Sequence, residues 1–384
     1  MTPGREWTSK ARRIAVLPGD GIGPEVMNEA LRVLDFVDNQ APVRSLTLEE
    51  YPWGSDYYRR HGKMMPTDGV SELAGYDALL FGAVGAPGVP DHVTLREFLL
   101  RIRFAFDQYI NLRPARLFEG VTSPVGLTPP FELVFVREGT EGEYAGLGGR
   151  LYEGTDRETA VQTSIFTRTG VDRVLRWSFE YARASGKTLT SVSKGNVLQY
   201  TGVLWDEVFR EISVEYPDVR SRNLLVDAAA MLLVKEPSSF QVVVGSNLFG
   251  DILTDLSSAL VGGLGIAPSA SLNPPGTFPS TFEPVHGSAP DIAGQGVANP
   301  IGMIWSTALM LGHLGFPAWE HAIVGAIQDA LSDPGMRTRD LGGRARTDEM
   351  ASAVIAALAD RRSELVNASA GKRSATTYTN LFEV

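Results

Sequence analysis

The chain has 384 residues, 43% of them hydrophobic, so it is long enough to fold into two packed domains with separate cores. Its formal net charge of −10, without a long basic run, argues against a nucleic-acid groove or an anionic membrane surface as partner. Because there is no cysteine and there are only five histidines, any metal ligands are expected to be carboxylates.

Hydrophobic patterning favours an α/β fold, because apolar runs that end in glycine alternate with segments of helical period. Strands are expected at residues 13–17, 77–84, 131–137, 189–193 and 240–245. Helices are expected at residues 23–38, 94–107, 170–185, 204–215, 224–235, 252–261 and 301–315. Neither a signal peptide nor a run of about 18 apolar residues is present, which predicts a cytoplasmic protein without a membrane span.

Two segments show neither the helical period nor an apolar, strand-like run. Residues 262–284 are rich in glycine, proline and serine, and we expect an irregular active-site or cofactor loop because functional groups follow at once. Residues 367–384 are polar, which is typical of a tail or of a strand that docks on a partner.

A glycine cluster follows the first expected strand. Gly19, Gly21 and Gly23 have the spacing G-x-G-x-G, so the third glycine of the dinucleotide-binding pattern G-x-G-x-x-G is missing. Pro24 falls at the expected helix start, where its missing N–H costs nothing. A tight turn explains the cluster as well as a cofactor site does.

Arginines are concentrated in three short windows, and a guanidinium binds a carboxylate through two parallel hydrogen bonds. The four candidates for a dicarboxylate site are Arg101, Arg103, Arg113 and Arg137. The alternative is that each forms an ordinary surface salt bridge, since the sequence does not show that they converge.

Asp251 and Asp255 lie four residues apart, which places both carboxylates on one helical face, about 6 Å from each other. A hard divalent cation such as Mg²⁺ or Mn²⁺ would relieve their repulsion. The alternative, a solvated acidic face, is disfavoured by the apolar neighbours Ile252 and Leu253. Asp227 stands alone in an apolar run, which usually means a paired or metal-bound carboxylate.

Two further residues are candidates for acid or base. Lys194 ends an apolar, strand-like run, and Tyr144 follows the polar turn after the strand at 131–137. Either could transfer a proton if burial and nearby charge moved its pKa toward neutrality, although most lysines and tyrosines have no such role.

Taken in order, these windows resemble the β-decarboxylating dehydrogenases, the family of isopropylmalate, isocitrate and tartrate/D-malate dehydrogenases. The resemblance covers residues 12–365, and its most specific blocks are residues 247–255 (NLFGDILTD) and 282–291 (FEPVHGSAPD). The windows most similar to the tartrate/D-malate branch are residues 107–113, 137–144 and 266–274.

The resemblance implies a role for each matching residue. Arg103, Arg113 and Arg137 would hold the substrate carboxylates, with Arg101 outside the clamp. Lys194 of the neighbouring subunit would take the hydroxyl proton, and Tyr144 would protonate the enolate left after decarboxylation. The implied metal ligands are Asp251 and Asp255, with Asp227 from the neighbouring subunit, and the implied cofactor-binding residues are His286, Gly287, Asp291, Asn299 and Asn196.

The implied fold is an isopropylmalate dehydrogenase-like, two-domain α/β/α architecture and not a conventional Rossmann domain. Residues 1–108 plus 263–384 would form the large cofactor-binding domain, and residues 109–262 the small domain with the dimer interface and an arm. The implied activity is oxidative decarboxylation of a (2R)-hydroxy dicarboxylate with NAD and Mg²⁺ or Mn²⁺. K⁺ is a further candidate cofactor, and the partners would be the hydroxy diacid and a second copy of the chain with shared active sites.

Specificity rests on four positions. Leu99 and Leu100 precede Arg103 on one expected helix, where they would form an apolar wall against the substrate's C3 group or simply join the core. Asp291 would accept hydrogen bonds from the cofactor ribose and repel a 2′-phosphate, which favours NAD over NADP; the alternative is a helix N-cap. Arg96 replaces a glutamate of isopropylmalate dehydrogenases.

Mixed signals keep three functions open. Residues 193–196 (SKGN) depart from the D-malate branch, and residues 226–231 (VDAAAM) look more like isopropylmalate dehydrogenase. We expect D-malate or tartrate as substrate, with 3-isopropylmalate as the alternative. A non-catalytic regulatory subunit is disfavoured, because the residues implied in the chemistry are all retained.

Overall fold

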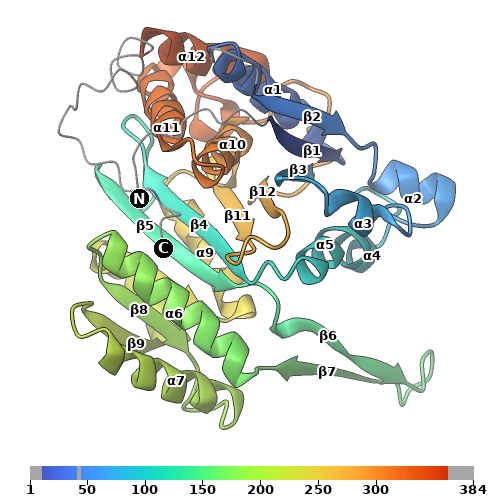
Figure 1. Cartoon of the computed structure of the whole chain (residues 1–384), viewed down its shortest axis with the longest axis vertical. Coiled ribbons are helices and arrows are strands. Elements are labelled where there is room, and N and C mark those ends of the chain that lie inside the picture. Colours follow the sequence, from blue (N-terminus) through green and yellow to red (C-terminus); the bar gives the residue numbers. More distant parts are fainter. Residues whose placement is uncertain (1–10, 41–44, 362–384) are drawn as a thin grey trace.

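One mixed ten-stranded sheet runs through the part of the chain that the computed structural model describes, residues 11–40 and 45–361 (Figure 1). The strand order is β2-β1-β3-β12-β11-β4-β5-β10-β8-β9. The strands are β1 (Arg12–Gly19), β2 (Leu46–Glu50), β3 (Ala78–Ala83), β4 (Ile110–Leu117), β5 (Phe131–Glu138), β8 (Leu189–Ser193), β9 (Ser221–Leu225), β10 (Val242–Gly245), β11 (Pro268–Leu272) and β12 (Ser280–Pro284).

Strand direction reverses at the centre of this sheet. The strands β2, β1, β3 and β12 are parallel to one another, and so are β5, β10, β8 and β9. Between these groups β11 is antiparallel to both β12 and β4, and β4 is antiparallel to β5. A conventional Rossmann sheet is parallel throughout, so this order confirms that the fold is a different α/β type.

Helices cover both faces of the sheet. Against β1, β3, β11 and β12 pack α1 (Gly23–Asp38) and α10 (Ile301–His313), and these two helices are covered in turn by α12 (Thr347–Asp360) and α11 (Pro317–Ser332). In the other half α6 (Arg168–Ala184) and α7 (Thr201–Glu215) lie in front of the strands in Figure 1, and α9 (Asn247–Leu260) lies behind, next to α8 (Val226–Lys235). The predicted division at residues 108/109 and 262/263 stays a prediction.

Shorter elements complete the described chain. The helices α2 (Ser55–His61), α3 (Gly69–Leu73) and α4 (Asp91–Thr94) precede a π-helical turn at Leu95–Leu99 and then α5 (Leu100–Ala105). The strands β6 (Gly142–Leu151) and β7 (Thr159–Ile165) form a two-stranded arm that projects from the body (Figure 1). In the described residues no helix combines the length and the hydrophobicity that a membrane crossing requires.

The first glycine cluster forms a tight turn between β1 and α1. Gly21 has a positive φ of 60°, and a Cβ there would meet the Ser288 carbonyl oxygen at 2.0 Å. Ile22 N–H donates to the same carbonyl at 2.8 Å, so the turn packs against the loop that follows β12. Pro24 lies in the first turn of α1, as predicted.

The prediction of an irregular loop at residues 262–284 is wrong, because this segment contributes β11 and β12. Its strand β11 reads Pro-Ser-Ala-Ser-Leu, so it has only one of the large apolar side chains by which buried strands are recognised. Its serines instead bond to a neighbouring strand, because the Asn111 amide donates to Ser269 Oγ at 2.8 Å and to Ser271 Oγ at 3.0 Å. The predicted tail at residues 367–384 lies outside the described residues.

Candidate active site

Side chains from both halves of the sheet line a cavity of about 190 Å³ where the strand direction reverses. Its walls come from β3, β4, β5, the helical segment at residues 95–103, α9, β11 and β12. Ligands of α/β proteins commonly bind where strand order changes, because the connections diverge there and leave a crevice. The topology therefore marks this cavity as the candidate active site.

The structure brings three of the four candidate arginines together in this cavity. Arg103 on α5, Arg113 on β4 and Arg137 on β5 all line it, and Arg103 and Arg137 are only 3% and 2% exposed. The surface salt-bridge alternative is therefore wrong for Arg103 and Arg137. Arg101 points elsewhere, since its Nη2 donates to the Thr67 carbonyl at 2.9 Å.

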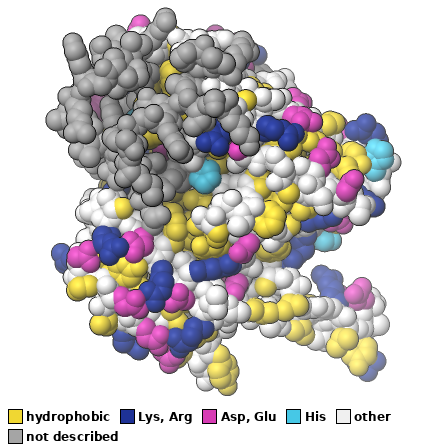
Figure 2. Space-filling view, in the orientation of Figure 1, with side chains coloured by type: hydrophobic (Ala, Val, Ile, Leu, Met, Phe, Trp, Pro, Cys, Tyr) yellow, Lys and Arg dark blue, Asp and Glu magenta, His cyan; other side chains and the backbone are white. Residues whose placement is uncertain are grey.

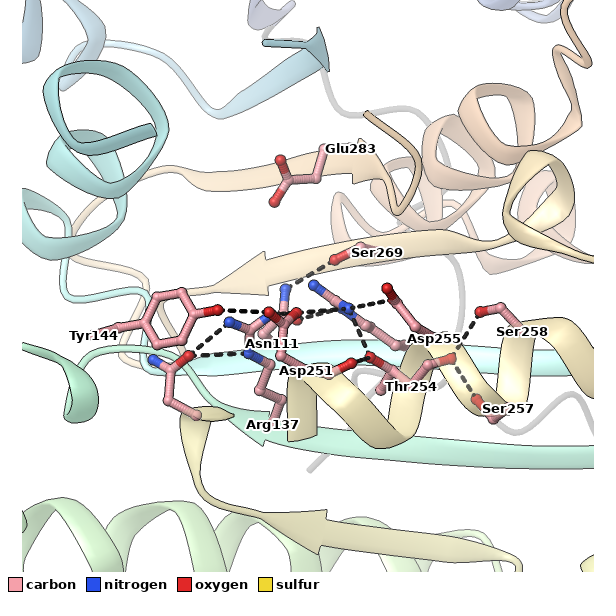
Figure 3. A network of polar contacts seen from close by, with 12 residues as sticks. Asn111, Arg137, Tyr144, Asp251, Thr254, Asp255, Ser257, Ser258, Ser269 and Glu283 are labelled. Atoms are coloured by element: carbon pink, nitrogen blue, oxygen red, sulfur yellow. Dashed lines mark hydrogen bonds and ion pairs between the residues drawn. The ribbon is translucent and has the colours of Figure 1, made fainter. Parts of the chain in front are cut away.

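Two of these arginines are held by neutral side chains and by Asp251 (Figure 3). Arg137 donates from Nε and Nη2 to Asn247 Oδ1 at 3.1 and 2.6 Å, and from Nη1 to Asp251. Arg113 donates from Nε to Asn111 Oδ1 and from Nη1 to Thr254 Oγ1, both at 2.7 Å. Burial, with Arg113 nearby, lowers the pKa of Arg137 to about 9, so the guanidinium stays charged at neutral pH.

Arg103 has a different partner. Its Nη2 lies 3.1 Å from Glu283 Oε1 on β12, and both side chains are buried. The Nε of Arg103 is buried without a hydrogen-bond acceptor among the described residues. Arg103 lines the cavity, and an unpaired buried N–H costs about 1–3 kcal/mol, so an anionic ligand beside this guanidinium would be favourable.

Tyr144 of β6 closes the cavity beside Asp251. Its Oη donates to Asp251 Oδ2 at 2.7 Å, and its ring lies 5.1 Å from the guanidinium carbon of Arg137 (Figure 3). Burial and the bond to Asp251 raise the pKa of Tyr144, so the phenol keeps its proton at neutral pH. A protonated hydroxyl at this place can act as an acid.

The two carboxylates of α9 are in different electrostatic environments. Burial alone would raise the pKa of Asp251, but Arg137 and Arg113 outweigh it and hold that pKa below its ordinary value. Burial raises the pKa of Asp255, whose Oδ1 is 3.8 Å from Arg113 Nη1. The side chains are 33% and 57% exposed, so Asp251 does not belong to a fully solvated acidic face.

These two carboxylates fit a hard divalent cation, which binds one or two protein carboxylates together with substrate and water. No cluster of three or more His, Asp, Glu or Cys side chains suited to a metal occurs in the described part of a single chain. Asp227, the third predicted ligand, lies on α8 and does not line the cavity. Its Oδ1 is 2.5 Å from Nζ of Lys194, which also lies away from the cavity, just beyond the end of β8.

Three of the predicted cofactor residues line a second cavity of about 460 Å³, namely His286, Asp291 and Asn299. His286 also lines the first cavity, as does Gly287, so the two spaces meet at this histidine. Burial lowers the pKa of His286, and its buried Nε2 has no partner among the described residues. Two cavities that share a lining histidine suit an elongated ligand such as a dinucleotide.

Asp291 and Asn196 lie in surroundings that the sequence did not predict. The N-cap alternative for Asp291 is wrong, because turns and bends, not a helix, follow this residue. Asn196 follows Lys194 at the end of β8 and lines neither cavity of its own chain.

Sequence reasoning missed Glu283, Asn247 and Asn111, which position the arginines. Glu283 was identifiable, since it lies between Phe282 and Pro284, where a buried carboxylate needs a charged partner. Nothing in the sequence around Asn111 marks its amide as the link between β4 and β11.

Comparison with known proteins agrees with this geometry. A family model described as isocitrate/isopropylmalate dehydrogenase matches residues 13–354. The chain belongs to this family. Among solved structures, isocitrate dehydrogenase from Methylococcus capsulatus has a TM-score of 0.82 and 35% identity, covering 90% of this chain and 99% of that one. The fold expected from the resemblance is thereby confirmed.

Relatives within the isocitrate/isopropylmalate dehydrogenase family carry three different names. A probable tartrate dehydrogenase/decarboxylase of Bacillus subtilis is 45% identical over 91% of this chain and 99% of its own length. The decarboxylating D-malate dehydrogenase of Escherichia coli is 49% identical over 90% and 98%. A 3-isopropylmalate dehydrogenase of Thermobifida fusca is also 49% identical, over 86% and 95%. The chain is therefore an enzyme of the decarboxylating dehydrogenase type, and overall identity does not separate the substrates.

Proposed function

We propose that this enzyme catalyses the NAD⁺-dependent oxidative decarboxylation of a (2R)-hydroxy dicarboxylate, with D-malate, which gives pyruvate and CO₂, or tartrate as substrate. The observation that carries the proposal is the convergence of Arg103, Arg113 and Arg137 with Asp251 and Tyr144 around one cavity. Three guanidinium groups in a confined space match the two carboxylates of a small diacid. The names of the tartrate and D-malate relatives point to the same reaction class.

Each residue then has one task. Arg103, Arg113 and Arg137 hold the substrate carboxylates, and their partners Glu283, Asn111 and Asn247 fix the guanidinium planes. Bound at Asp251 and Asp255, Mg²⁺ or Mn²⁺ would supply Lewis acidity to the hydroxyl and the enolate, and NAD⁺ would accept the hydride.

Proton transfer falls to two other side chains. Lys194 of the second subunit takes the hydroxyl proton. Tyr144 gives its proton to the enolate carbon after CO₂ leaves, and the raised pKa that keeps the phenol protonated supports this role.

We propose a homodimer with shared active sites. Lys194 and Asp227 do not line the cavity of their own chain, so in a monomer the site would lack its base and its third carboxylate. Apolar side chains are exposed nearby, with Met231 on α8 58% and Ile252 on α9 59% exposed. Figure 2 shows further apolar side chains along the projecting arm, where Leu151 is 60% exposed. Exposed apolar surfaces of this kind mark protein interfaces, and a second copy would cover them.

We propose NAD⁺ as the preferred cofactor, with K⁺ as a further candidate, and the cytoplasm as the compartment. Asp291 is exposed at the cavity that also contains His286 and Asn299. A carboxylate there accepts hydrogen bonds from ribose hydroxyls and repels a 2′-phosphate.

One observation favours 3-isopropylmalate as the second candidate substrate. Leu95, Leu99 and Leu100 all line the cavity, so this side of it is apolar. An apolar wall suits an isopropyl group at C3 better than the hydrogen or hydroxyl of D-malate or tartrate, and burying that group contributes about 1.5–3 kcal/mol.

Steady-state kinetics decide between the candidates. We would compare kcat/KM for D-malate, L-tartrate, meso-tartrate, 3-isopropylmalate and isocitrate with NAD⁺ and Mn²⁺. We expect the highest value for D-malate or a tartrate. A preference for 3-isopropylmalate of about tenfold or more would overturn that expectation, because it is the minimum that burial of the isopropyl group predicts. Failure to turn over any diacid would favour the regulatory-subunit alternative.

A further inference from the structure

A separate polar cavity of about 490 Å³ lies at the amino ends of β8 and β9, near the start of β10. Two arginines, five serine or threonine residues and one glutamine line it, together with Leu189. No carboxylate from the described residues contributes to this lining. The cavity is therefore rich in hydrogen-bond donors and carries an excess of positive charge.

The two arginines, Arg220 and Arg222, are held differently. The Arg222 guanidinium donates to Thr190 Oγ1 at 3.1 Å and to the Ser239 carbonyl at 2.9 Å, and it lies 4.8 Å from the ring centre of Phe240. Its position is fixed by β8 and by residues 239–240, so ligand binding would cost little ordering of this side chain. The Arg220 side chain makes no hydrogen bond or ion pair with another described residue, and neither arginine has a carboxylate partner there.

We propose that this cavity binds a phosphoryl group, either as inorganic phosphate or as part of a nucleotide. A phosphoryl dianion presents oxygens in tetrahedral directions, and donors reach this cavity from three segments: β8, β9 and the turn before β10. Arginine forks and hydroxyl groups are the side chains that bind such oxygens. The positive charge of the lining excludes a cation, and the polar side chains of the lining exclude an apolar ligand.

The phosphoryl site is distinct from the candidate active site. The strands β8 and β9 run from this cavity toward Lys194 and Asp227, which follow their carboxyl ends. A strand of five residues spans roughly 17 Å, so a ligand at Arg220 does not reach the catalytic side chains. Phosphoryl binding is therefore expected to coexist with bound substrate and NAD⁺.

Isothermal titration calorimetry with inorganic phosphate tests the proposal. The full-length enzyme would be saturated with NADH, D-malate and Mg²⁺ at constant ionic strength, so that the anion sites in the catalytic cavities are filled and no turnover occurs, because NADH cannot accept a hydride. We expect Arg220→Gln to bind phosphate at least about tenfold more weakly than the wild type, because it loses a charge-assisted pair of hydrogen bonds. The exposed Arg60 on α2 lies outside the cavity, so Arg60→Gln is the charge-matched control and should bind normally.

A second variant separates binding from folding. Arg222→Lys keeps the positive charge but loses the planar fork, so it should also weaken phosphate binding, while circular dichroism reports any loss of fold. Adenosine monophosphate, titrated under the same conditions, identifies the source: tighter binding than phosphate assigns a nucleotide, and equal binding assigns the free anion. If Arg220→Gln and Arg222→Lys, both folded, bind phosphate with wild-type affinity, the proposal is overturned.

Discussion

Replacing Asp251 with asparagine is expected to weaken both stability and metal-dependent turnover, because one carboxylate serves both. In the structure Asp251 forms ion pairs with Arg137 and Arg113 and accepts a hydrogen bond from Tyr144. The variant leaves the buried Arg137 guanidinium without a countercharge, and it leaves Arg113 with only the more distant carboxylate of Asp255. Repulsion between Asp251 and Asp255 alone would predict the opposite sign, a gain in stability, so the sign of the change tests the ion-pair argument.

The expected loss follows from the burial of the pair. Removing one partner of a fully buried ion pair costs about 3–5 kcal/mol. One third of the Asp251 side chain is exposed, with a value of 33%, and asparagine keeps an oxygen for Tyr144, so we expect a loss of about 1–3 kcal/mol. Because the folded pKa of Asp251 lies below its ordinary value of 3.8, this stabilisation is present above that pH and is lost as the pH falls further.

Asp255→Asn is the matched control, because it removes a carboxylate from the same helix face. Asp255 is 57% exposed and 3.8 Å from Arg113, so its loss should change the free energy of unfolding by less than about 0.5 kcal/mol. Urea unfolding in EDTA measures stability, and kcat/KM at limiting Mn²⁺ measures the metal site. An Asp251→Asn enzyme as stable as the wild type would refute the ion-pair reasoning. Wild-type activity of either variant at limiting Mn²⁺ would refute the metal assignment.

Three further predictions concern proton transfer, cofactor choice and pH. The Tyr144→Phe enzyme should retain more activity in reducing an added 2-oxo acid intermediate with NADH than in the full reaction. The Lys194→Met enzyme should lose both activities. Equal losses of the two activities in both variants would contradict this division of roles. The wild type should prefer NAD⁺ over NADP⁺ by at least about tenfold, and Asp291→Lys should narrow that ratio; an unchanged ratio would contradict the role of Asp291. Burial raises the pKa of Glu320 from 4.5 to about 8, so the free energy of unfolding should fall as the pH rises through that range. Glu320→Gln should remove this loss of stability. If urea unfolding gives the same pH dependence of the free energy of unfolding for the wild type and the variant, the role of Glu320 is refuted.

The sequence predicted a helix or strand correctly where its hydrophobic pattern ended at a clear boundary residue. β8 occupies residues 189–193 and α1 residues 23–38, as expected, because an apolar run or stripe ends at a polar or turn residue in each case. The helix at 252–261 was predicted too short, since it begins at Asn247, whose amide binds Arg137. The expected helix at 94–107 is divided into a π-helical turn and α5.

The site was harder to predict than the strands, because its contacts join distant segments. The spacing of Asp251 and Asp255 predicted a shared helix face, and both do approach Arg113. The Arg103–Glu283 pair joins residues 180 apart, and no local pattern predicts such a pairing. Mutual neutralisation of Asp251 by the arginines was also unforeseen, since it depends on how β4, β5 and α9 pack.

The charges around the cavity explain why substrate and metal suit it as a pair. Arg103, Arg113 and Arg137 face Asp251 and Glu283 in the lining, so three positive charges oppose two negative ones and one positive charge remains. A diacid alone would reverse that sign in a partly buried space, and a divalent cation alone would add to it. Together they are neutral and leave the balance of the lining unchanged. Substrate carboxylates can then replace Asp251 at Arg113 and Arg137, which frees Asp251 for the metal, and neither exchange leaves a buried charge unpaired.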